Sequence, residues 1–254
     1  MKVLLVGATG NLGIRLVPAL LTHGHSVVAF VRSSEKLESL LPQSVYRQVA
    51  VVEGNATDSA AIKKAILDTS CDAVVNTAGL AALPPWGKSD LPNIFRAVLD
   101  GVSEAGTERE RPLRAWFLGG LGVLHFPGSE SMLSNYIPIY LAHRQNLRLL
   151  QSLRPDALDW SLLCPSDMIP ESSDFGVPTK ISRARLAANA TTPPLWNDSW
   201  IRYVPLIGRT VLCAMNAGRY VTTLEQNAEF IASDLESNGG QWSRKTVGVI
   251  NSVE

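Results

Sequence analysis

Three residues on one turn of an expected helix have the side chains to move a proton. Tyr140, His143 and Arg144 lie in the stretch "YLAHR", and leucines further along predict a helix that begins near Tyr136. Residues three and four apart on a helix share a face. A cation beside a phenol favours the ionised form, so Tyr140 and His143 are candidate catalytic groups and Arg144 a candidate cofactor contact. The alternative is a half-buried aromatic residue beside a solvated base.

A glycine-rich turn is the most specific signal in the chain. In "VGATGNLG" (6–13), glycines at 7, 10 and 13 stand between an apolar strand pattern and a helix pattern. Such a turn lets a dinucleotide pyrophosphate approach the backbone and the N-terminus of the helix. The candidate contacts are Gly7, Thr9, Gly10, Asn11, Leu12 and Gly13. Pro18 lies inside the predicted helix, where we expect a kink or a local break.

The residues after the second strand indicate which nicotinamide cofactor fits. A site for NAD places an acid there to hold the ribose 2′-hydroxyl, whereas this chain has Arg32 and then Ser33, with no acid before Glu35. A guanidinium is suited to a phosphate. The sequence therefore predicts NADP(H), with NADPH favoured over NADH. The alternative is an ordinary exposed arginine.

Further candidates stand where predicted strands end. Thr77, Ala78 and Gly79 follow the fourth strand, and the small side chains let the backbone approach a ribose and the nicotinamide. Gly119 and Gly120 end the fifth strand, and Pro165 follows the sixth. Ligands of open α/β sheets bind at this edge, so we expect these residues to contact the cofactor.

Strand and helix patterns alternate over the first 165 residues. The expected strands are 2–7, 26–31, 46–52, 72–78, 115–120 and 159–164, with a short strand and a helix over 220–236 and a last strand at 245–250. Asp58 is expected to cap a helix. The pattern predicts an α/β fold: a Rossmann-like, doubly wound parallel sheet forming a single domain over 1–254. Residues 165–215 are rich in proline and aromatics, include one expected helix at "SRARLAANA" (182–190), and are expected to form a small substrate lobe.

Composition excludes several classes of protein. Formal net charge is zero and no apolar run approaches the length of a bilayer span, so we expect neither nucleic acid nor membrane as a partner. The three cysteines are far apart and odd in number, which suits buried thiols in a reducing, cytoplasmic setting. The four histidines show no metal-ligand spacing, and we expect no metal.

The motifs together resemble a known family. "GATGNLG", "FVRSSEKL", "GNATD", "FLGGLG" and "LDWSLLCPSDM", in this order over residues 2–170, are similar to the atypical short-chain dehydrogenase/reductases. The similarity is strongest to the NmrA-like and NAD(P)H-binding, flavin-reductase-like branches, which include the biliverdin-reductase-B-like group. The resemblance implies a Rossmann-like domain, NADP(H) and hydride transfer to a small flat acceptor. It also places Asn55 and Ala56 beside the adenine; the alternative for Asn55 is a turn residue.

The chain departs from the family at the catalytic positions. Typical members carry serine or threonine where this chain has Gly119 and Gly120, and a Tyr-x-x-x-Lys pair where it has Tyr140 and Arg144. Aligned on the downstream "LDW", Ala142 or His143 lies nearer the usual lysine position. Arginine is bulkier than lysine and is not equivalent to it. Reduction of flavin- or quinone-like acceptors depends less on catalytic side chains, because the cofactor supplies the hydride and water can supply the proton.

An apolar pocket over the nicotinamide is expected to bind the substrate. Its candidate walls are Trp86, Leu121, His125, Met168, Trp196 and Trp200. The tryptophans are equally well explained as the core of the lobe, and His125 as a structural or surface residue.

These observations favour an NADPH-dependent reductase of a small aromatic, carbonyl, quinone- or flavin-like metabolite. The alternatives are a non-catalytic NADP(H)-binding redox sensor and a non-redox isomerase or cyclase on the same scaffold. The glycine pair and the missing lysine favour a sensor, whereas the aromatic lobe opposes it. An apolar helix face would also allow a homodimer.

Overall fold

The computed structural model describes residues 1–79, 89–177, 186–237 and 240–252. An eight-stranded sheet in the order β3-β2-β1-β4-β5-β6-β10-β8 runs through the molecule, and every pairing is parallel except β10 with β8. The strands are β1 Lys2–Val6, β2 Ser26–Val31, β3 Val49–Glu53, β4 Ala73–Asn76, β5 Arg114–Leu118, β6 Asp159–Cys164, β7 Met168–Ile169, β8 Leu186–Ala190, β9 Thr222–Thr223 and β10 Lys245–Asn251. Strands β7 and β9 form a separate short pair.

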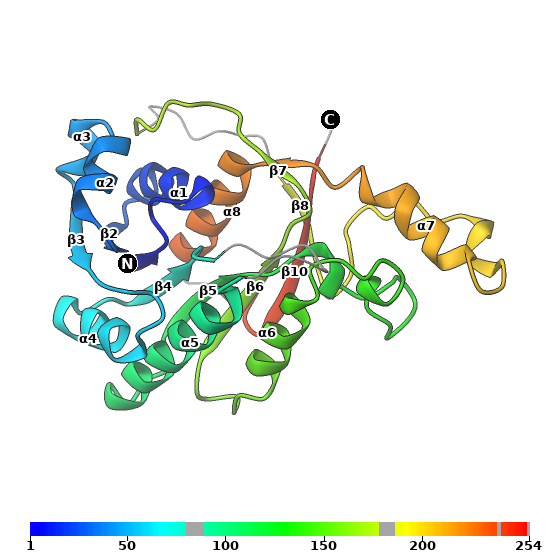
Figure 1. The fold of residues 1–254 in the computed structure, drawn as a ribbon, viewed down its shortest axis with the longest axis horizontal. Helices are drawn as coiled ribbons and strands as arrows, with labels where there is room; N and C mark the ends of the chain where they lie inside the picture. Colours follow the sequence, from blue (N-terminus) through cyan, green and yellow to red (C-terminus); the bar gives the residue numbers. More distant parts are fainter. Residues whose placement is uncertain (80–88, 178–185, 238–239, 253–254) are drawn as a thin grey trace.

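Helices cover both faces of the sheet (Figure 1). The helices are α1 Asn11–Thr22, α2 Ser34–Leu40, α3 Gln43–Tyr46, α4 Ser59–Thr69, α5 Leu91–Glu108, α6 Ala142–Gln151, α7 Gly208–Ala217 and α8 Leu224–Glu236, with single 3-10 turns η1 Leu121–Val123, η2 Leu133–Asn135 and η3 Trp200–Tyr203. Two apolar cores result. One packs α4, α5 and α6 against the sheet, and the other packs α1, α2 and α8. The predicted doubly wound α/β architecture is confirmed.

Local signals predicted several details correctly. Asp58 caps α4 by accepting a hydrogen bond from Ala61 N–H (3.0 Å). The three cysteines, Cys71, Cys164 and Cys213, are buried free thiols. A short strand, β9, leads into α8 as expected. Its helix begins with a capping box in which Thr223 and Gln226 bond each other's backbone N–H groups.

Pro18 does not break the first helix. Helix α1 continues from Asn11 to Thr22, and every residue from Leu12 to Leu20 is buried. The expected local break is therefore wrong, because packing between the sheet and α8 offsets the backbone hydrogen bond that proline cannot donate; a kink at Pro18 stays a prediction.

The stretch "SRARLAANA" was expected to be a helix, but its described part forms strand β8. Residues 186–190 pair antiparallel with β10, with Leu186 opposite Asn251. Alanine and leucine favour helices, yet the open edge of β10 offers a row of backbone partners, and tertiary pairing outweighs the local preference. The 165–215 segment thus adds a strand to the main sheet, and only its part beyond β8 projects outward.

Other boundaries move as well. Tyr46 ends α3, so the third strand begins at Val49 and not at residue 46. The helix expected from Tyr136 begins at Ala142. Pro138 disfavours helical geometry in the residue before it, and Tyr140 takes a left-handed backbone conformation with φ of 51°.

Candidate functional site

The glycine turn between β1 and α1 is held in place by close backbone packing. Gly7 has φ of 91°, and a Cβ on it would lie 2.6 Å from Ala78 N. A Cβ on Gly13 would lie 2.1 Å from Gly7 O. Any larger residue at either position would push α1 away from β1 or from the end of β4. The glycines therefore fix the N-terminus of α1 at the carboxyl edge of the sheet.

The start of α1 fits a pyrophosphate. Gly10 is the N-cap, is exposed, and has no side chain that could bond the first N–H groups of the helix. The first N–H groups of α1 and the positive end of its dipole are therefore left open, with no side chain over them at Gly10. A bound phosphate needs this arrangement. The residues present thus fit the pyrophosphate of a dinucleotide.

The other predicted residues of this region have structural partners of their own. Leu12 is buried in the core, and the Asn11 carbonyl accepts a hydrogen bond from Arg15 (2.8 Å). Thr9 is half-buried. Thr77 donates its hydroxyl to Val6 O (3.1 Å), which ties the end of β4 to β1. Their contacts with a cofactor stay predictions.

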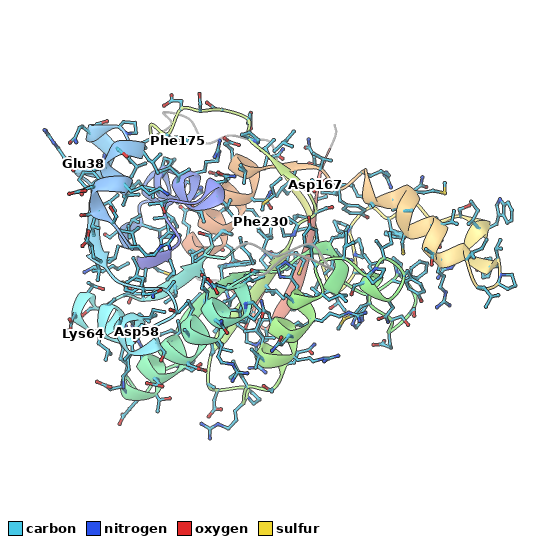
Figure 2. The ribbon with its side chains drawn as sticks, viewed as in Figure 1. Glu38, Asp58, Lys64, Asp167, Phe175 and Phe230 are labelled. Atoms are coloured by element: carbon cyan, nitrogen blue, oxygen red, sulfur yellow. The ribbon has the colours of Figure 1, made fainter. Side chains whose placement is uncertain are left out.

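A segment that the sequence did not single out is fastened over α1. Arg15 donates to Glu225 at the start of α8 (2.5 Å) and to the carbonyl of Ser172 (2.6 Å). The Glu225 carboxylate also accepts the N–H groups of Glu171 (2.9 Å) and Ser172 (3.1 Å). The Arg15 guanidinium lies 5.1 Å from the ring centre of Phe175, which Figure 2 shows above α1. One arginine–glutamate pair therefore anchors residues 171–175 beside the helix that carries the phosphate turn.

A polar cavity of about 700 Å³ lies at the carboxyl ends of β2 and β3. Its lining residues are Arg32, Asn55, Thr57, Ser59, Asp90, Asn93, Arg96, Ala97 and Asp100. Arg32 is exposed and makes no hydrogen bond or ion pair with any residue that the structure describes. Arg96, on α5, is a second cation that sequence reasoning missed. The cavity brings together the predicted phosphate and adenine contacts, Arg32 and Asn55.

The remaining predicted adenosine contacts also act locally. Ser33 caps α2 by accepting a bond from Lys36 N–H (3.1 Å). Asn55 accepts one from Thr57 N–H (3.1 Å), as a turn residue would, while still lining the cavity. Ala56 packs on the core. Glu53, at the end of β3, accepts the N–H of Ser34 (2.7 Å), which places an unexpected carboxylate near this site.

The larger cavity, of about 830 Å³, opens where β4, β5 and β6 end. The predicted residues that line it are Ala78, Gly79, Gly119, Gly120, Leu121, Tyr140, His143, Pro165, Met168 and Trp196. Sequence reasoning missed the apolar walls Leu91, Phe95, Val123, Leu133, Ile137 and Ile139, and the polar residues Asn76, Ser134, Ser166, Asp167 and Cys213. Asn76 carried a usable signal, because it is a buried polar residue that ends an apolar strand.

His143 occupies the space beside Gly120. A Cβ on Gly120 would lie 3.0 Å from His143 Cδ2 and 3.4 Å from Nε2, and a Cβ on Gly119 would lie 3.0 Å from Leu162 Cγ. A serine or threonine at either position would therefore meet a neighbouring side chain. Gly119 already donates its N–H to Leu163 O (2.7 Å). The imidazole of His143 thus lies at the cavity wall beside Gly120, which has no side chain of its own.

Burial lowers the pKa of His143 to about 4, so the imidazole is neutral near pH 7. Its Nδ1 is buried and has no hydrogen-bond partner among the described residues. Nε2 is therefore the ring nitrogen that can reach a molecule in the cavity. Burial also raises the pKa of the Cys213 thiol to about 11, which keeps it protonated and a poor nucleophile.

Tyr140 and Arg144 do not form the pair expected from a shared helix face. Tyr140 precedes α6 and lines the cavity with its side chain partly exposed. Arg144 instead bonds Ser134 Oγ (2.7 Å) and Asn135, and it does not line the cavity. The expectation was wrong because the helix begins two residues after Tyr140. Arg144 fastens the η2 turn to α6.

Two predicted substrate contacts lie outside this cavity. His125 forms an isolated bridge with Met132, and its ring lies 3.7 Å from Glu130, outside the cavity lining. Trp200 is 75% exposed on the projecting lobe. Both predictions are corrected: composition marked the aromatic segment but could not say which face of it turns inward. Trp86 lies outside the described residues.

Two further predictions concern absences. No group of histidine, cysteine or acidic side chains among the described residues is arranged to hold a metal ion. Within the same part of the chain, every helix is too short or too polar to cross a bilayer.

Comparison with known proteins gives the site its context. A model of the NAD(P)H-binding family matches residues 7–189. The chain is 35% identical over 106 residues to the uncharacterized sugar epimerase YhfK of Bacillus subtilis. The matched segment covers 41% of this chain and 45% of that protein, so the chain spans less than half the length of that relative.

Solved structures share the fold. A short-chain dehydrogenase/reductase of Veillonella parvula in complex with NADP is 13% identical with a TM-score of 0.62, covering 98% of this chain and 94% of that one. ChuY, an anaerobilin reductase of Escherichia coli O157:H7, is 16% identical with a TM-score of 0.61, covering 100% and 98%. The fold predicted from the sequence is therefore shared along the whole chain.

Proposed function

The chain belongs to the NAD(P)H-binding family, and from that premise we propose that it is an NADPH-dependent reductase of a small, flat, apolar acceptor such as a quinone, a flavin or an aromatic carbonyl compound. It has the NAD(P)-dependent oxidoreductase scaffold. The acceptor class and the preference for NADPH are the parts proposed here.

The observation that carries the proposal is the neutral His143 at the wall of a largely apolar cavity. The cavity opens at the ends of β4, β5 and β6, the edge at which ligands of parallel sheets bind. Its volume of about 830 Å³ suits a nicotinamide and a flat acceptor together. Apolar walls from α5 and from residues 121–139 would exclude water and favour an uncharged aromatic molecule.

The residues of the chain would bind and orient the nicotinamide and the acceptor, rather than exchange protons with them rapidly. The nicotinamide, when bound, supplies the hydride. His143 Nε2 can donate a hydrogen bond to an acceptor oxygen or nitrogen and so stabilise charge that develops there. With a pKa of about 4, His143 is not an effective acid near pH 7, so the proton comes from water or from the partly exposed Tyr140.

The preference for NADPH rests on the polar cavity. Arg32 and Arg96 line it, and Arg32 has no partner among the described side chains, so its guanidinium is available to a 2′-phosphate. Asp90 and Asp100 line the same cavity and oppose a phosphate. The preference is therefore expected to depend on Arg32 and to be lost when its charge is reversed.

The first test is calorimetric titration of NADPH and NADH into three proteins. Arg32→Asp should weaken NADPH binding by roughly 10²-fold or more, since a bidentate contact to phosphate is lost and repulsion replaces it, and should change NADH binding far less. Arg154→Asp, at an exposed arginine in the loop after α6, is the matched control and should bind like the wild type. Equal losses for both cofactors in Arg32→Asp would contradict the assignment.

The second test follows absorbance of the nicotinamide while flavins, quinones and aromatic ketones are offered. His143→Gln should lower kcat roughly 10²-fold while leaving the affinity for NADPH unchanged, because it removes a hydrogen bond made at the reacting acceptor. Tyr140→Phe tests the phenol as proton donor. Tight NADPH binding without oxidation by any acceptor would favour the redox sensor. Conversion of a substrate without NADPH consumption would favour an isomerase or cyclase.

A further inference from the structure

The projecting end of the lobe carries an apolar ridge. We define the lobe tip as residues 195–215, which comprise η3, the turn after it and most of α7. Trp200 is 75%, Tyr203 80%, Leu206 102% and Ile207 60% exposed. Figure 1 shows α7 at the end of the molecule farthest from α2 and α3. Large apolar side chains gathered in one exposed place indicate a binding surface and not ordinary surface variation.

The lobe tip is convex. Leu206 is as exposed as an isolated residue, and its φ of 67° is unfavourable for a branched side chain. A convex ridge of this kind can bind either a protein partner with a matching concave surface or a lipid surface, which adapts to the shape of the ridge.

The charges around the lobe tip favour a lipid surface over a protein partner. Residues 195–219 contain three arginines, at 202, 209 and 219, and one acid, Asp198, so this segment has a net charge of +2 (3 − 1) in a chain whose total is zero. Arg202 pairs with Asp198. Arg209 and Arg219 bond only neutral groups among the described residues, Tyr136 Oη and the Leu195 carbonyl among them. Their positive charges therefore stay uncompensated beside the apolar ridge.

We propose that the lobe tip docks onto the surface of a lipid bilayer that contains anionic phospholipid. Tryptophan and tyrosine favour the boundary between headgroups and acyl chains, leucine and isoleucine the layer below, and arginines the anionic headgroups. We expected no membrane partner from the net charge and the absence of a spanning segment, but neither property reports on a ridge assembled by the fold.

The docked element is also a wall of the larger cavity. Cys213 and Ala217 of α7, with Gly218 after it, line the cavity, whereas Ile207 and Met215 face outward. Docking would thus bring the cavity close to the bilayer, from which an apolar molecule could enter. The docking itself is independent of the proposed reductase activity and is tested without turnover.

The test is co-sedimentation of the full-length protein with vesicles. We expect binding to vesicles of phosphatidylcholine with phosphatidylserine, weaker binding to phosphatidylcholine alone, and weaker binding at high salt. Leu206→Glu should lower the partition coefficient at least about tenfold, because a leucine that enters the bilayer on docking is replaced by a charge that anionic headgroups repel. Leu40→Glu, the same substitution at an exposed leucine on α2, is the control and should bind like the wild type. Calorimetric titration with NADPH checks that both variants are folded.

Four outcomes would overturn the proposal. They are no vesicle binding, equal binding to both vesicle types, binding unaffected by Leu206→Glu, and equal loss in both glutamate variants. Sedimentation velocity without lipid distinguishes a fifth. A dimer that Leu206→Glu dissociates, with no vesicle binding by the wild type, would assign the lobe tip to a second copy of the chain and would also overturn membrane docking.

Discussion

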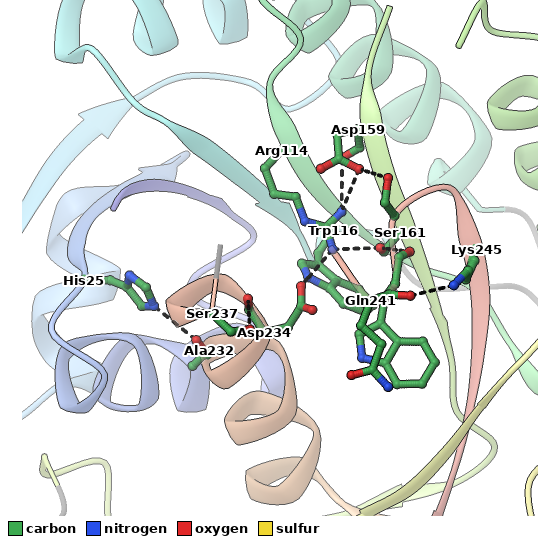
Figure 3. A network of polar contacts seen from close by, with 12 residues as sticks. His25, Arg114, Trp116, Asp159, Ser161, Ala232, Asp234, Ser237, Gln241 and Lys245 are labelled. Atoms are coloured by element: carbon green, nitrogen blue, oxygen red, sulfur yellow. Dashed lines mark hydrogen bonds and ion pairs between the residues drawn. The ribbon is translucent and has the colours of Figure 1, made fainter. Parts of the chain in front are cut away.

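Polar side chains buried beneath α8 each make hydrogen bonds, whereas some side chains at or near the larger cavity, such as those of His143 and Asn146, make none within the described structure. On the α8 face, Arg114 donates to Asp234 (2.8 Å) and to Ser161 (2.8 Å), and Trp116 donates its indole N–H to the same Asp234 carboxylate (2.9 Å). Figure 3 shows this network joining α8 to β5 and β6. His23, the C-cap of α1, bonds both Glu229 and Glu236 of α8. Every residue named here contributes at least one hydrogen bond.

The wall of the larger cavity differs. His143 Nδ1 and the Trp196 indole N–H at this wall are buried without a partner among the described residues, and so are both amide atoms of Asn146, which lies behind the wall three residues after His143 on α6. Two atoms on the α8 face, Arg114 Nε and Asn227 Oδ1, are also unpartnered, but each of those side chains makes other hydrogen bonds. His143 and Asn146 make none within the described structure.

This difference separates a scaffold from a site. A satisfied network fixes α8 and α1 on one face of the sheet. The rigidity of this face positions the glycine turn at the start of α1. Unsatisfied groups beside a cavity reduce stability and persist where a ligand or an ordered water supplies the missing partners. The side of the molecule that the sequence marks most strongly is thus the scaffold, and the proposed chemistry belongs to the side with the weaker local signals.

The largest expected effect comes from breaking the scaffold. Asp234→Ala leaves the buried Arg114 guanidinium without its carboxylate and should reduce the free energy of unfolding by about 3–5 kcal/mol, measured by denaturant titration. Asp68→Ala is the matched control, because Asp68 pairs with the exposed Lys64 on α4. Figure 2 shows Lys64 at the edge of the molecule. The change for Asp68→Ala should amount to less than about 1 kcal/mol. Similar losses in both variants would mean that the network is no stronger than a surface pair.

Two histidines, His143 beside the cavity and His23 beside α8, should respond to pH in opposite directions. Burial lowers the pKa of His143 from 6.5 to about 4, so the unfolded chain binds a proton that the folded chain does not, and stability is lost as pH falls from about 6.5 towards 4. For His23, burial lowers the pKa, but hydrogen bonds and charges from Glu236 and Glu229 together raise it above 6.5. Its contribution is therefore present below pH 6.5 and is lost as pH rises through the folded-state pKa.

Denaturant titrations across this range would resolve the two contributions. His143→Gln should flatten the loss of stability on the acid side, whereas His23→Gln should destabilise more at acidic than at alkaline pH. Each variant is the control for the other, since both remove one imidazole. Parallel changes in the two variants would mean that their surroundings do not differ as described.

Sequence reasoning reached the scaffold because its signals are local. Glycine spacing located the α1 turn, alternating patterns located the sheet, and Asp58 was recognisable as a cap. The position of Arg32 at the end of β2 followed from the same rule and placed it in the polar cavity.

The cavity was harder to predict because it depends on contacts between distant segments. The packing of His143 on Gly120 joins α6 to the end of β5, and no local pattern indicates that pairing. Strand β8 exists because β10 has an open edge, and the aromatic segment divides between Trp196, which faces the cavity, and Trp200, which faces outward. These features require the tertiary structure.

The smallest expected effect gives the sharpest comparison. Asn146 is fully buried and its amide has no described partner, so Asn146→Leu, which nearly preserves volume, should raise the free energy of unfolding by about 1–2 kcal/mol. Asn216 is the matched control, because it is equally buried but bonds the carbonyls of Asn197 (2.9 Å) and Leu212 (3.0 Å). Asn216→Leu should lower the same free energy by about 1–3 kcal/mol. If both substitutions destabilise alike in denaturant titrations, Asn146 already has a water partner, and the contrast between the two faces would rest on His143 and Trp196.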